Sequence, residues 1–463
     1  MERRLVVIAA FAFLAAAVLY SAWVPGQFAN AAIDRTQGYL SELAARNQRW
    51  SIMFRVADCL AGLSCLAGVA LIPRVRREWA GWLALALFGA FTVLDGLFPL
   101  DCAARSDPVC EIGPLSFSHR LHGLFGALAA ACALVAAVLL ARCWRTRGAW
   151  LLSGVYALVS AFTVTAILTG TLIGAAQRAQ VAILAIWLVY VAVHLLSRPG
   201  PPHRDPPEWR GRRESGSAVL EEGAGPAVLI TSGMGGAWFH WDAVASDLAG
   251  DHRVIRFDRP GLGRSPAATA PPTLYGEAAR LAALAPAHPE KAAVIAHSMA
   301  AWNAEAFARL HPLRVSRLVL VDPSCRDGLG RGTSALGRAV GRWLPALGGT
   351  WGATAVARCF GRLAHRLSGA GGDREGVYRE GPVLAAAVGE WFAYRDMALE
   401  LRTIRREHPF PPIPTVVISA GRANPCHERL ARELGAELVR LPDSGHQVHL
   451  DVPDVITRSF IRE

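Results

Sequence analysis

The chain has 463 residues, of which 52% are hydrophobic and 18% charged, and its formal net charge is +11. Arginine supplies nearly all of the positive charge, because Lys291 is the only lysine. No arginine-rich stripe with interleaved aromatic residues is present, which argues against a nucleic-acid partner. The length allows two domains with separate cores.

Six apolar segments occupy the first 200 residues, and most approach the ~20 residues needed to cross a bilayer. They are Leu5–Trp23, Ile52–Ile72, Trp79–Leu100, Leu121–Ala141, Ala149–Leu172 and Val181–Leu196. The first is interpreted as a retained helix, because five spans follow it and Trp23-Val24-Pro25 is a poor cleavage site. The last is short, and we expect Arg178 and Arg198 to snorkel at its ends. Residues 1–197 are predicted to form an all-α bundle of six transmembrane helices.

Arginines in the short loops predict the orientation of this bundle. They are concentrated before the first span, between the second and third, between the fourth and fifth, and after the sixth. In the loops on the other side of the membrane, acidic residues offset the charge of the arginines. We therefore expect a multi-pass protein of the cell membrane with both termini in the cytoplasm. Cys102 and Cys110 lie in a predicted external loop, where a disulfide can persist.

Several ionisable residues map to the outer ends of the second to fourth spans. Such groups are costly at membrane depth and are often functional. The favoured interpretation is interfacial snorkelling and pairing between helices, including an Arg55–Asp58 pair on one helix face. A lipid-headgroup site, a metal site or a transport function in this cluster is the alternative. The cluster comprises Asp58, Asp95, His119 and His122, with Asp101 nearby.

The N-terminal half is similar to an uncharacterised bacterial six-helix membrane family. The resemblance is carried by Tyr39-Leu40-Ser41-Glu42-Leu43 and by Phe98-Pro99-Leu100-Asp101, followed by His119 and His122. The resemblance implies the topology of six membrane-spanning helices, but it does not imply any chemical reaction.

Residues 198–216 are rich in proline, glycine and arginine and have no apolar periodicity, which predicts a semi-rigid tether. From residue 217 to 463, apolar strands alternate with helical stretches, which predicts a mostly parallel sheet with right-handed crossovers. The expected strands are Ala227–Ser232, Arg253–Phe257, Ala292–Ala296, Leu318–Val321, Thr415–Ser419 and Ala436–Leu441.

A serine stands where one of these strands runs into a helix, in Ala296-His297-Ser298-Met299-Ala300. This resembles the nucleophile elbow of the α/β-hydrolase superfamily, with both glycines of G-x-S-x-G replaced by alanine. The resemblance extends from Ala227 to Ile461 and implies that Ser298 is a nucleophile. It also implies one oxyanion donor in Thr231–Gly236, for which the Met234 amide is our candidate, with the Met299 amide as the second.

Two further segments match the family's order of motifs. Arg256–Ser265 resembles its D-x-x-G-x-G-x-S turn, which is structural. Asp443–Pro453 resembles the loop that carries the base, so His446 is the expected general base, while His449 is expected to point elsewhere.

The acid of a triad is less evident. Asn424 stands where many members of the family have a carboxylate, and an amide cannot stabilise a protonated imidazole. Asp322, which follows the strand Leu318–Val321, is the favoured acid. The competing interpretation is that Asp322 only caps a turn with Pro323.

These residues predict a membrane-tethered serine hydrolase with a helical cap at about residues 326–410 and no cofactor or metal. The expected partners are the lipid bilayer and a lipophilic or membrane-proximal ester as the small-molecule acyl substrate. Aromatic residues of the cap suit such an ester or simply pack the cap onto the sheet. A degenerate hydrolase fold that binds a ligand or acts as a scaffold is the alternative. The oligomeric state is not predicted.

Overall fold

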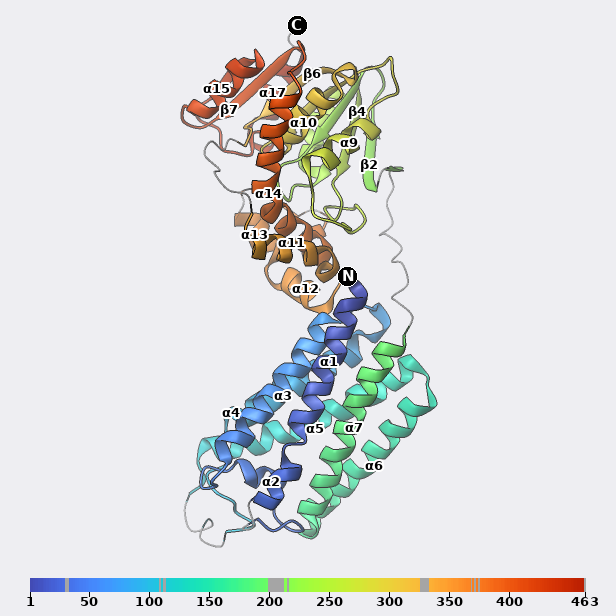
Figure 1. Cartoon of the computed structure of the whole chain (residues 1–463), viewed down its shortest axis with the longest axis vertical. Coiled ribbons are helices and arrows are strands. Elements are labelled where there is room, and N and C mark those ends of the chain that lie inside the picture. Colours follow the sequence, from blue (N-terminus) through green and yellow to red (C-terminus); the bar gives the residue numbers. More distant parts are fainter. Residues whose placement is uncertain are drawn as a thin grey trace. The chain divides into compact units, whose positions relative to one another are not determined.

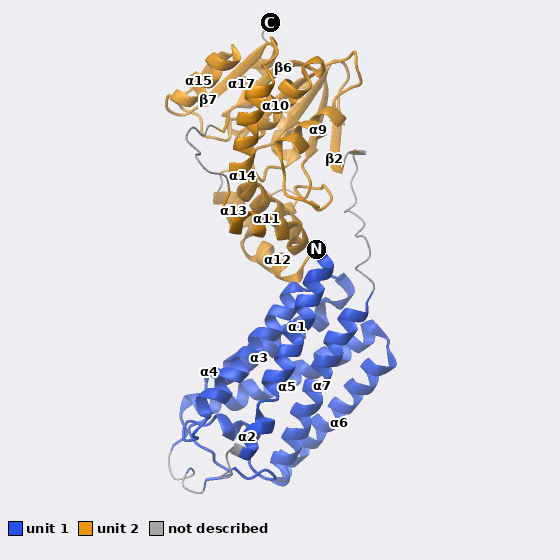
Figure 2. Ribbon diagram, in the orientation of Figure 1, with its two compact units in different colours: residues 1–202 blue, residues 203–463 orange. Residues whose placement is uncertain are grey.

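The computed structural model describes residues 1–29, 33–107, 110, 114–198, 212–214, 216–324, 333–367, 369, 372–373 and 375–461. The chain divides into two compact units, Met1–Pro202 and His203–Glu463 (Figure 2). Most of the predicted tether, residues 198–216, lies outside the described residues.

The N-terminal unit is helical (Figure 1). Six of its described helical segments are long and apolar enough to cross a membrane, which confirms the six predicted spans. The unit consists of α1 (Glu2–Tyr20), α2 (Trp23–Ala29), η1 (Leu40–Ala44), α3 (Ser51–Leu71), η2 (Arg76–Glu78), α4 (Trp79–Leu97), α5 (Phe117–Trp144), α6 (Arg147–Thr169) and α7 (Ile173–Ser197).

Small residues let neighbouring helices of this unit approach closely. A Cβ on Gly62 of α3 would lie 2.4 Å from the Gly89 carbonyl oxygen of α4. Without a hydrophobic force between helices in lipid, such close backbone packing is what holds a bundle together.

The sixth span is longer than predicted, and Arg178 does not lie at its end. Helix α7 has 25 residues, and Arg178 is buried inside it. Its Nη1 donates to the carbonyl oxygens of Gly38 and Gly174, at 3.3 and 2.9 Å. A neighbouring loop and its own helix thus accept hydrogen bonds from Nη1 of the buried Arg178, whereas Nε and Nη2 have no hydrogen-bond partner among the described residues. Snorkelling was therefore the wrong expectation for this residue.

The predicted polar cluster contains two carboxylate–histidine pairs. His122 Nδ1 lies 3.3 Å from Asp95 Oδ1 and 3.1 Å from the Asp95 carbonyl oxygen. His119 Nδ1 lies 4.0 Å from Asp101 Oδ2 and accepts the Asp101 backbone N–H at 3.2 Å. Asp58 lies on α3, and on the same helix Arg55 Nε donates to the Gly96 carbonyl oxygen at 3.0 Å. Among the described residues, no group of three or more potential ligands is arranged to hold a metal ion.

The C-terminal unit contains a mostly parallel sheet, which has eight strands in its described part, in the order β1-β2-β4-β3-β5-β6-β7-β8. The six predicted strands are present. The edge strand β1 and its neighbour β2, which lies between β1 and β4, pair antiparallel and were not predicted. The strands are β1 (Arg212–Glu214), β2 (Ser217–Glu222), β3 (Ala227–Thr231), β4 (Arg253–Asp258), β5 (Ala292–His297), β6 (Val315–Val321), β7 (Thr415–Ala420) and β8 (Glu437–Leu441).

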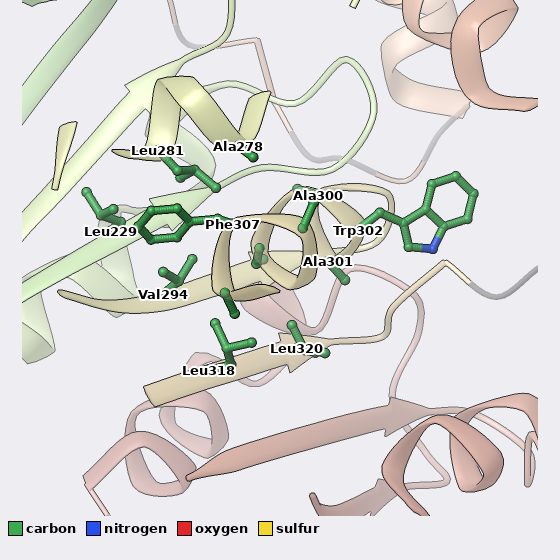
Figure 3. Close-up of a cluster of buried hydrophobic side chains, with 14 of the residues drawn as sticks. Leu229, Ala278, Leu281, Val294, Ala300, Ala301, Trp302, Phe307, Leu318 and Leu320 are labelled. Atoms are coloured by element: carbon green, nitrogen blue, oxygen red, sulfur yellow. The ribbon is translucent and has the colours of Figure 1, made fainter. Parts of the chain in front are cut away.

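Helices cover both faces of the sheet, and alternate residues of β5 serve the two cores. Val294 and Ala296 point into the core beneath α9 and α10, where Phe307 is fully buried (Figure 3). Ile295 points into the other core, beneath α8 and α17. Side chains of a strand alternate between faces, so a strand buried on both is continuously apolar. These helices are α8 (Asp242–Leu248), α9 (Leu274–Leu284), α10 (Ala300–Leu310) and α17 (Pro453–Ile461).

The segment after β6 contains a helical cap, as predicted. Its last helix, α14 (Gly381–Glu407), packs against the cap helices α11 and α12 and also against α9 and α10 of the core. The cap helix therefore continues into the core. The remaining helical elements are η4 (Trp238–Trp241), η5 (Pro312–Arg314), α11 (Ala335–Gly348), α12 (Trp351–Val356), η6 (Ala357–Gly361), α13 (Arg362–Leu367), η7 (Val377–Arg379), α15 (Pro425–Leu434) and α16 (Val448–Asp451).

Candidate active site

Ser298 occupies a strained turn between β5 and α10. Its φ is +54°, a conformation that L residues rarely adopt and that the surrounding structure must impose. The Ser298 N–H donates to the Val321 carbonyl oxygen at 2.9 Å, which fixes the turn to the neighbouring strand β6. Ala296 and Ala300, on either side, are fully buried. Alanine is thus small enough for the close packing that glycine provides in the usual motif.

Ser298, His446 and Asp322 form a chain of hydrogen bonds. Ser298 Oγ lies 3.0 Å from His446 Nε2, and His446 Nδ1 lies 2.5 Å from Asp322 Oδ2. The His446 side chain is half exposed, whereas Ser298 is buried apart from 9% of its surface. The imidazole therefore lies between a carboxylate and the Ser298 hydroxyl, and solvent reaches the site on the side of His446. The structure brings together all three residues singled out in the sequence.

Asp322 is held in place from two strands. It follows β6 with a φ of +39°, and its N–H donates to the Ile418 carbonyl oxygen of β7 at 2.7 Å. Its Oδ1 accepts the Ala420 N–H at 2.9 Å. Burial raises the pKa of Asp322, but the hydrogen bonds from His446 and Ala420 outweigh it and hold the pKa below its ordinary value. Asp322 is therefore a carboxylate when it meets His446.

Asn424 has a different place. Its Oδ1 accepts the Cys426 N–H at 3.0 Å, so it caps the N-terminus of α15. His427, one turn into that helix, was not singled out in the sequence. The ring of His427 is buried, with Nδ1 2.8 Å from Ser419 Oγ and Nε2 2.8 Å from the Pro323 carbonyl oxygen. The same Nδ1 lies 3.8 Å from Asp322 Oδ1, so the buried His427 ring lies next to the Asp322 carboxylate.

The predicted oxyanion segment, Thr231–Gly236, lies against the nucleophile. A Cβ on Gly233 would be 3.0 Å from Ser298 Cβ and 2.7 Å from His297 Nδ1. Glycine is required here because the backbone itself approaches the serine. The two candidate donors, the Met234 and Met299 amides, belong to the two segments that adjoin Ser298.

A buried arginine holds this segment, which we call the oxyanion loop. Arg259 follows β4, and its Nη2 donates to the Gly233 carbonyl oxygen at 2.7 Å, while Nη1 donates to that of Ser232. Its Nε donates to Glu390 Oε1 of the cap helix α14 at 2.6 Å. Glu390 Oε2 in turn accepts the Gly235 N–H at 2.8 Å. The sequence predicts Arg259 only as part of a structural turn, and no motif or pattern in the sequence predicts a role for Glu390.

The turn around Arg259 has the structural role that the sequence predicts for it. Asp258 accepts the Trp238 and Arg264 N–H groups, each at 2.9 Å. Burial raises the pKa of Asp258 to about 7, although these two hydrogen bonds act to lower it. Gly263 has a φ of +49°, and a Cβ there would lie 2.0 Å from Asp258 Oδ2. Only glycine lets the turn close over this carboxyl group.

Two further histidines pack behind the base. His297 Nε2 lies 2.8 Å from the His446 carbonyl oxygen. Burial lowers the pKa of His297 to about 3, so its ring is neutral and Nε2 donates this hydrogen bond. His449 stacks on Trp241 with 4.4 Å between ring centroids, and burial lowers its pKa too. The His449 ring therefore packs against Trp241, whereas the His446 ring meets Ser298.

An aromatic pair joins the elbow helix α10 to the cap. The ring of Trp302 packs on that of Tyr394 of α14 in a tilted arrangement, with 4.5 Å between centroids, and Trp302 Nε1 donates to the Ser324 carbonyl oxygen at 2.7 Å. Ser324 Oγ lies 3.4 Å from Ser298 Oγ. By contrast, Trp391 is 64% exposed. Tyr394 thus packs the cap onto the elbow helix, and Trp391 lies on the surface.

Comparison with known proteins identifies both halves. Residues 228–458 match the model described as "Alpha/beta hydrolase family", and residues 13–194 match the one described as "Protein of unknown function (DUF998)". A protein of Variovorax paradoxus named as a carbamate hydrolase is 34% identical over 101 residues. That match covers 21% of this chain and spans 38% of the length of the relative.

Solved structures with similarity include an α/β hydrolase fold protein from Burkholderia ambifaria, with 21% identity and a TM-score of 0.40 over 54% of this chain and 96% of that one. An enol-lactonase from Burkholderia xenovorans has 21% identity and a TM-score of 0.39, over 53% and 95% of the two chains. The C-terminal domain therefore has the α/β hydrolase fold and matches that family over residues 228–458, and the N-terminal helices match the DUF998 family over residues 13–194.

Proposed function

We propose that the protein is a membrane-tethered serine hydrolase that cleaves an ester bond. The observation that carries the proposal is the chain of hydrogen bonds from Ser298 through His446 to Asp322, at 3.0 and 2.5 Å. A serine hydroxyl is a weak nucleophile by itself, and a neighbouring imidazole held by a carboxylate activates it.

In this mechanism Ser298 Oγ attacks the ester carbonyl carbon while His446 Nε2 takes the hydroxyl proton. Asp322 keeps the proton on Nδ1 of His446 and stabilises the imidazolium. The Met234 and Met299 amides donate to the oxyanion that develops on the carbonyl oxygen. His446 then protonates the departing alkoxide, and the same steps with water release the acid from Ser298 and restore the serine.

We place the domain on the cytoplasmic side and expect a lipophilic or membrane-proximal ester. The arginine distribution favours cytoplasmic termini. In this topology Cys102 and Cys110, which form a disulfide, lie in a loop on the opposite side of the membrane from the domain. The aromatic pair of Trp302 and Tyr394, which joins the elbow helix to the cap, is consistent with an apolar acyl chain as the group that the cap accommodates.

Labelling of the purified full chain with a fluorophosphonate tests the proposal. This probe phosphonylates an activated serine and needs no knowledge of the natural ester. We expect wild type to label and Ser298→Ala not to label, whereas Ser324→Ala, which removes the adjacent hydroxyl, should still label. Wild type that fails to label, or Ser298→Ala that labels equally, would reject the proposal.

A further inference from the structure

The cap contains a helical segment that is continuous from α12 through η6 to α13, residues 351–367 (Figure 1). Four of its residues face inward and are buried: Thr354, Ala357, Gly361 and His365. We call this element the cap-edge helix. Its orientation about its own axis determines which side chains reach the surface.

Contacts with Tyr378 fix that orientation. A Cβ on Gly361 would lie 1.9 Å from the Tyr378 carbonyl oxygen, so no side chain fits between the two backbones. One turn later, the His365 ring stacks on the Tyr378 ring with 3.7 Å between centroids. The inward side is therefore pinned at two successive turns, and the opposite side must face outward.

The outward side is apolar. Val356, Phe360, Leu363 and Leu367 are 49%, 61%, 55% and 79% exposed. Their spacing of four, three and four residues is that of one helix face. Large apolar side chains exposed singly are normal, but a continuous stripe of them indicates a surface that another phase or molecule covers.

Arginines flank this stripe. Arg358, Arg362 and Arg366 are exposed and recur every four residues, so they form a line beside the apolar face. Arg362 lies 3.6 Å from Asp373, which leaves Arg358 and Arg366 as the main sources of net positive charge. An apolar face with basic residues along its border is the pattern of a helix that lies in the interface of a bilayer.

We propose that the cap-edge helix lies in the surface of an anionic lipid bilayer. Its arginines complement acidic headgroups, and the four apolar side chains insert beneath them. Lipid is the occupant we favour because six segments of the same chain are suited to span a bilayer, which keeps this domain at a high effective concentration near lipid. The inference does not depend on the proposed hydrolysis.

Photocrosslinking of the full chain in nanodiscs tests it. Phe360 is replaced by p-benzoyl-phenylalanine, and the products of irradiation are identified by mass spectrometry. Leu313, which is 66% exposed on η5 of the core, carries the same group as the control. We expect lipid adducts at position 360 at least about fivefold above those at 313, with a higher yield in phosphatidylglycerol than in phosphatidylcholine.

A second variant tests the arginines. Combined Arg358→Gln and Arg366→Gln should remove most of the preference for phosphatidylglycerol while the domain still unfolds at the wild-type temperature. Equal lipid adducts at 360 and 313 would overturn the proposal. So would a crosslink from position 360 to residues of the same chain or to a second copy in place of lipid, since either would identify a protein as the occupant.

Discussion

Glu390 of the cap helix and Arg259 of the core form an ion pair, with 2.6 Å between Oε1 and Nε, and each side chain is 5% exposed or less. The same two residues hydrogen-bond to three backbone groups of the oxyanion loop, at Ser232, Gly233 and Gly235. The cap and the oxyanion loop are therefore mechanically joined. A cap displaced from the core would release the loop beside Ser298.

The first prediction concerns Glu390. Glu390→Gln keeps the shape of the side chain but removes the charge that holds Arg259. The oxyanion loop then loses its fixed geometry. Stabilisation of the transition state by the oxyanion donors should weaken more than binding of the ester in its ground state. We expect kcat for a soluble ester to fall by about tenfold or more with little change in KM.

Glu305→Gln is the matched control. Glu305 on α10 is also buried and pairs with Arg405 of the same cap helix, at 2.7 Å, but its side chain accepts hydrogen bonds from Arg309 and Arg405, whereas that of Glu390 reaches the oxyanion loop. Both variants should lower the unfolding temperature to a similar degree. Equal losses of kcat in the two would show that the Glu390 effect comes from general destabilisation.

The second prediction distinguishes the two candidate acids. Asp322→Asn leaves the shape of the site intact but cannot stabilise the imidazolium of His446, so kcat should fall by about 10³-fold or more. Asn424→Ala removes only a helix cap and should cost about 1 kcal/mol of stability with nearly unchanged kcat. Steady-state kinetics and thermal unfolding of both variants decide it, and the reverse pattern would reject Asp322 as the acid.

The third prediction concerns pH. The pKa of His297 is about 3 in the folded chain, because burial disfavours its charged form, against 6.5 for a free histidine. Between these values the unfolded state binds a proton that the folded state does not. The free energy of unfolding should therefore fall as the pH drops below 6.5, by up to about 1.4 kcal/mol per pH unit from this group.

Urea unfolding of wild type and His297→Gln at several pH values measures this dependence. The variant keeps an N–H donor for the His446 carbonyl oxygen but cannot titrate, so its stability should decline less steeply on acidification. Above about pH 7.5, where a free histidine is neutral, the difference between the two proteins should be independent of pH. Parallel curves throughout would contradict the prediction.

The fourth prediction concerns the turn at Asp258. Gly263→Ala forces a Cβ into the space of the Asp258 carboxyl group and a left-handed backbone conformation on alanine, which should cost about 2 kcal/mol or more. Gly250→Ala is the control, because a Cβ there meets nothing within 4 Å. Thermal unfolding should show a clear drop for the first and almost none for the second. A similar Tm for both would mean that the turn can rearrange.

Periodicity was enough to predict six spans and the main strands, whereas the elbow at Ser298 was predicted from its resemblance to a family motif. Apolar length determines a transmembrane helix, and continuous apolarity determines a strand buried on both faces, so both are local properties. Asp322 was favoured over Asn424 because an amide cannot stabilise a protonated imidazole, so the triad would otherwise lack its acid. The short distance from Asp322 to His446 could not be predicted, since 124 residues separate the two in the chain.

Only the tertiary structure decided what supports the site. Arg259 and Glu390 are 131 residues apart, and charged residues carry no periodic signal that they will be buried together. The edge strand β1 and its neighbour β2 were missed because they are short and partly polar, and pairing with β4 is what makes β2 a strand. Arg178 was misplaced for the same reason: the carbonyl oxygen of Gly38 that lets it stay buried belongs to a loop 140 residues away.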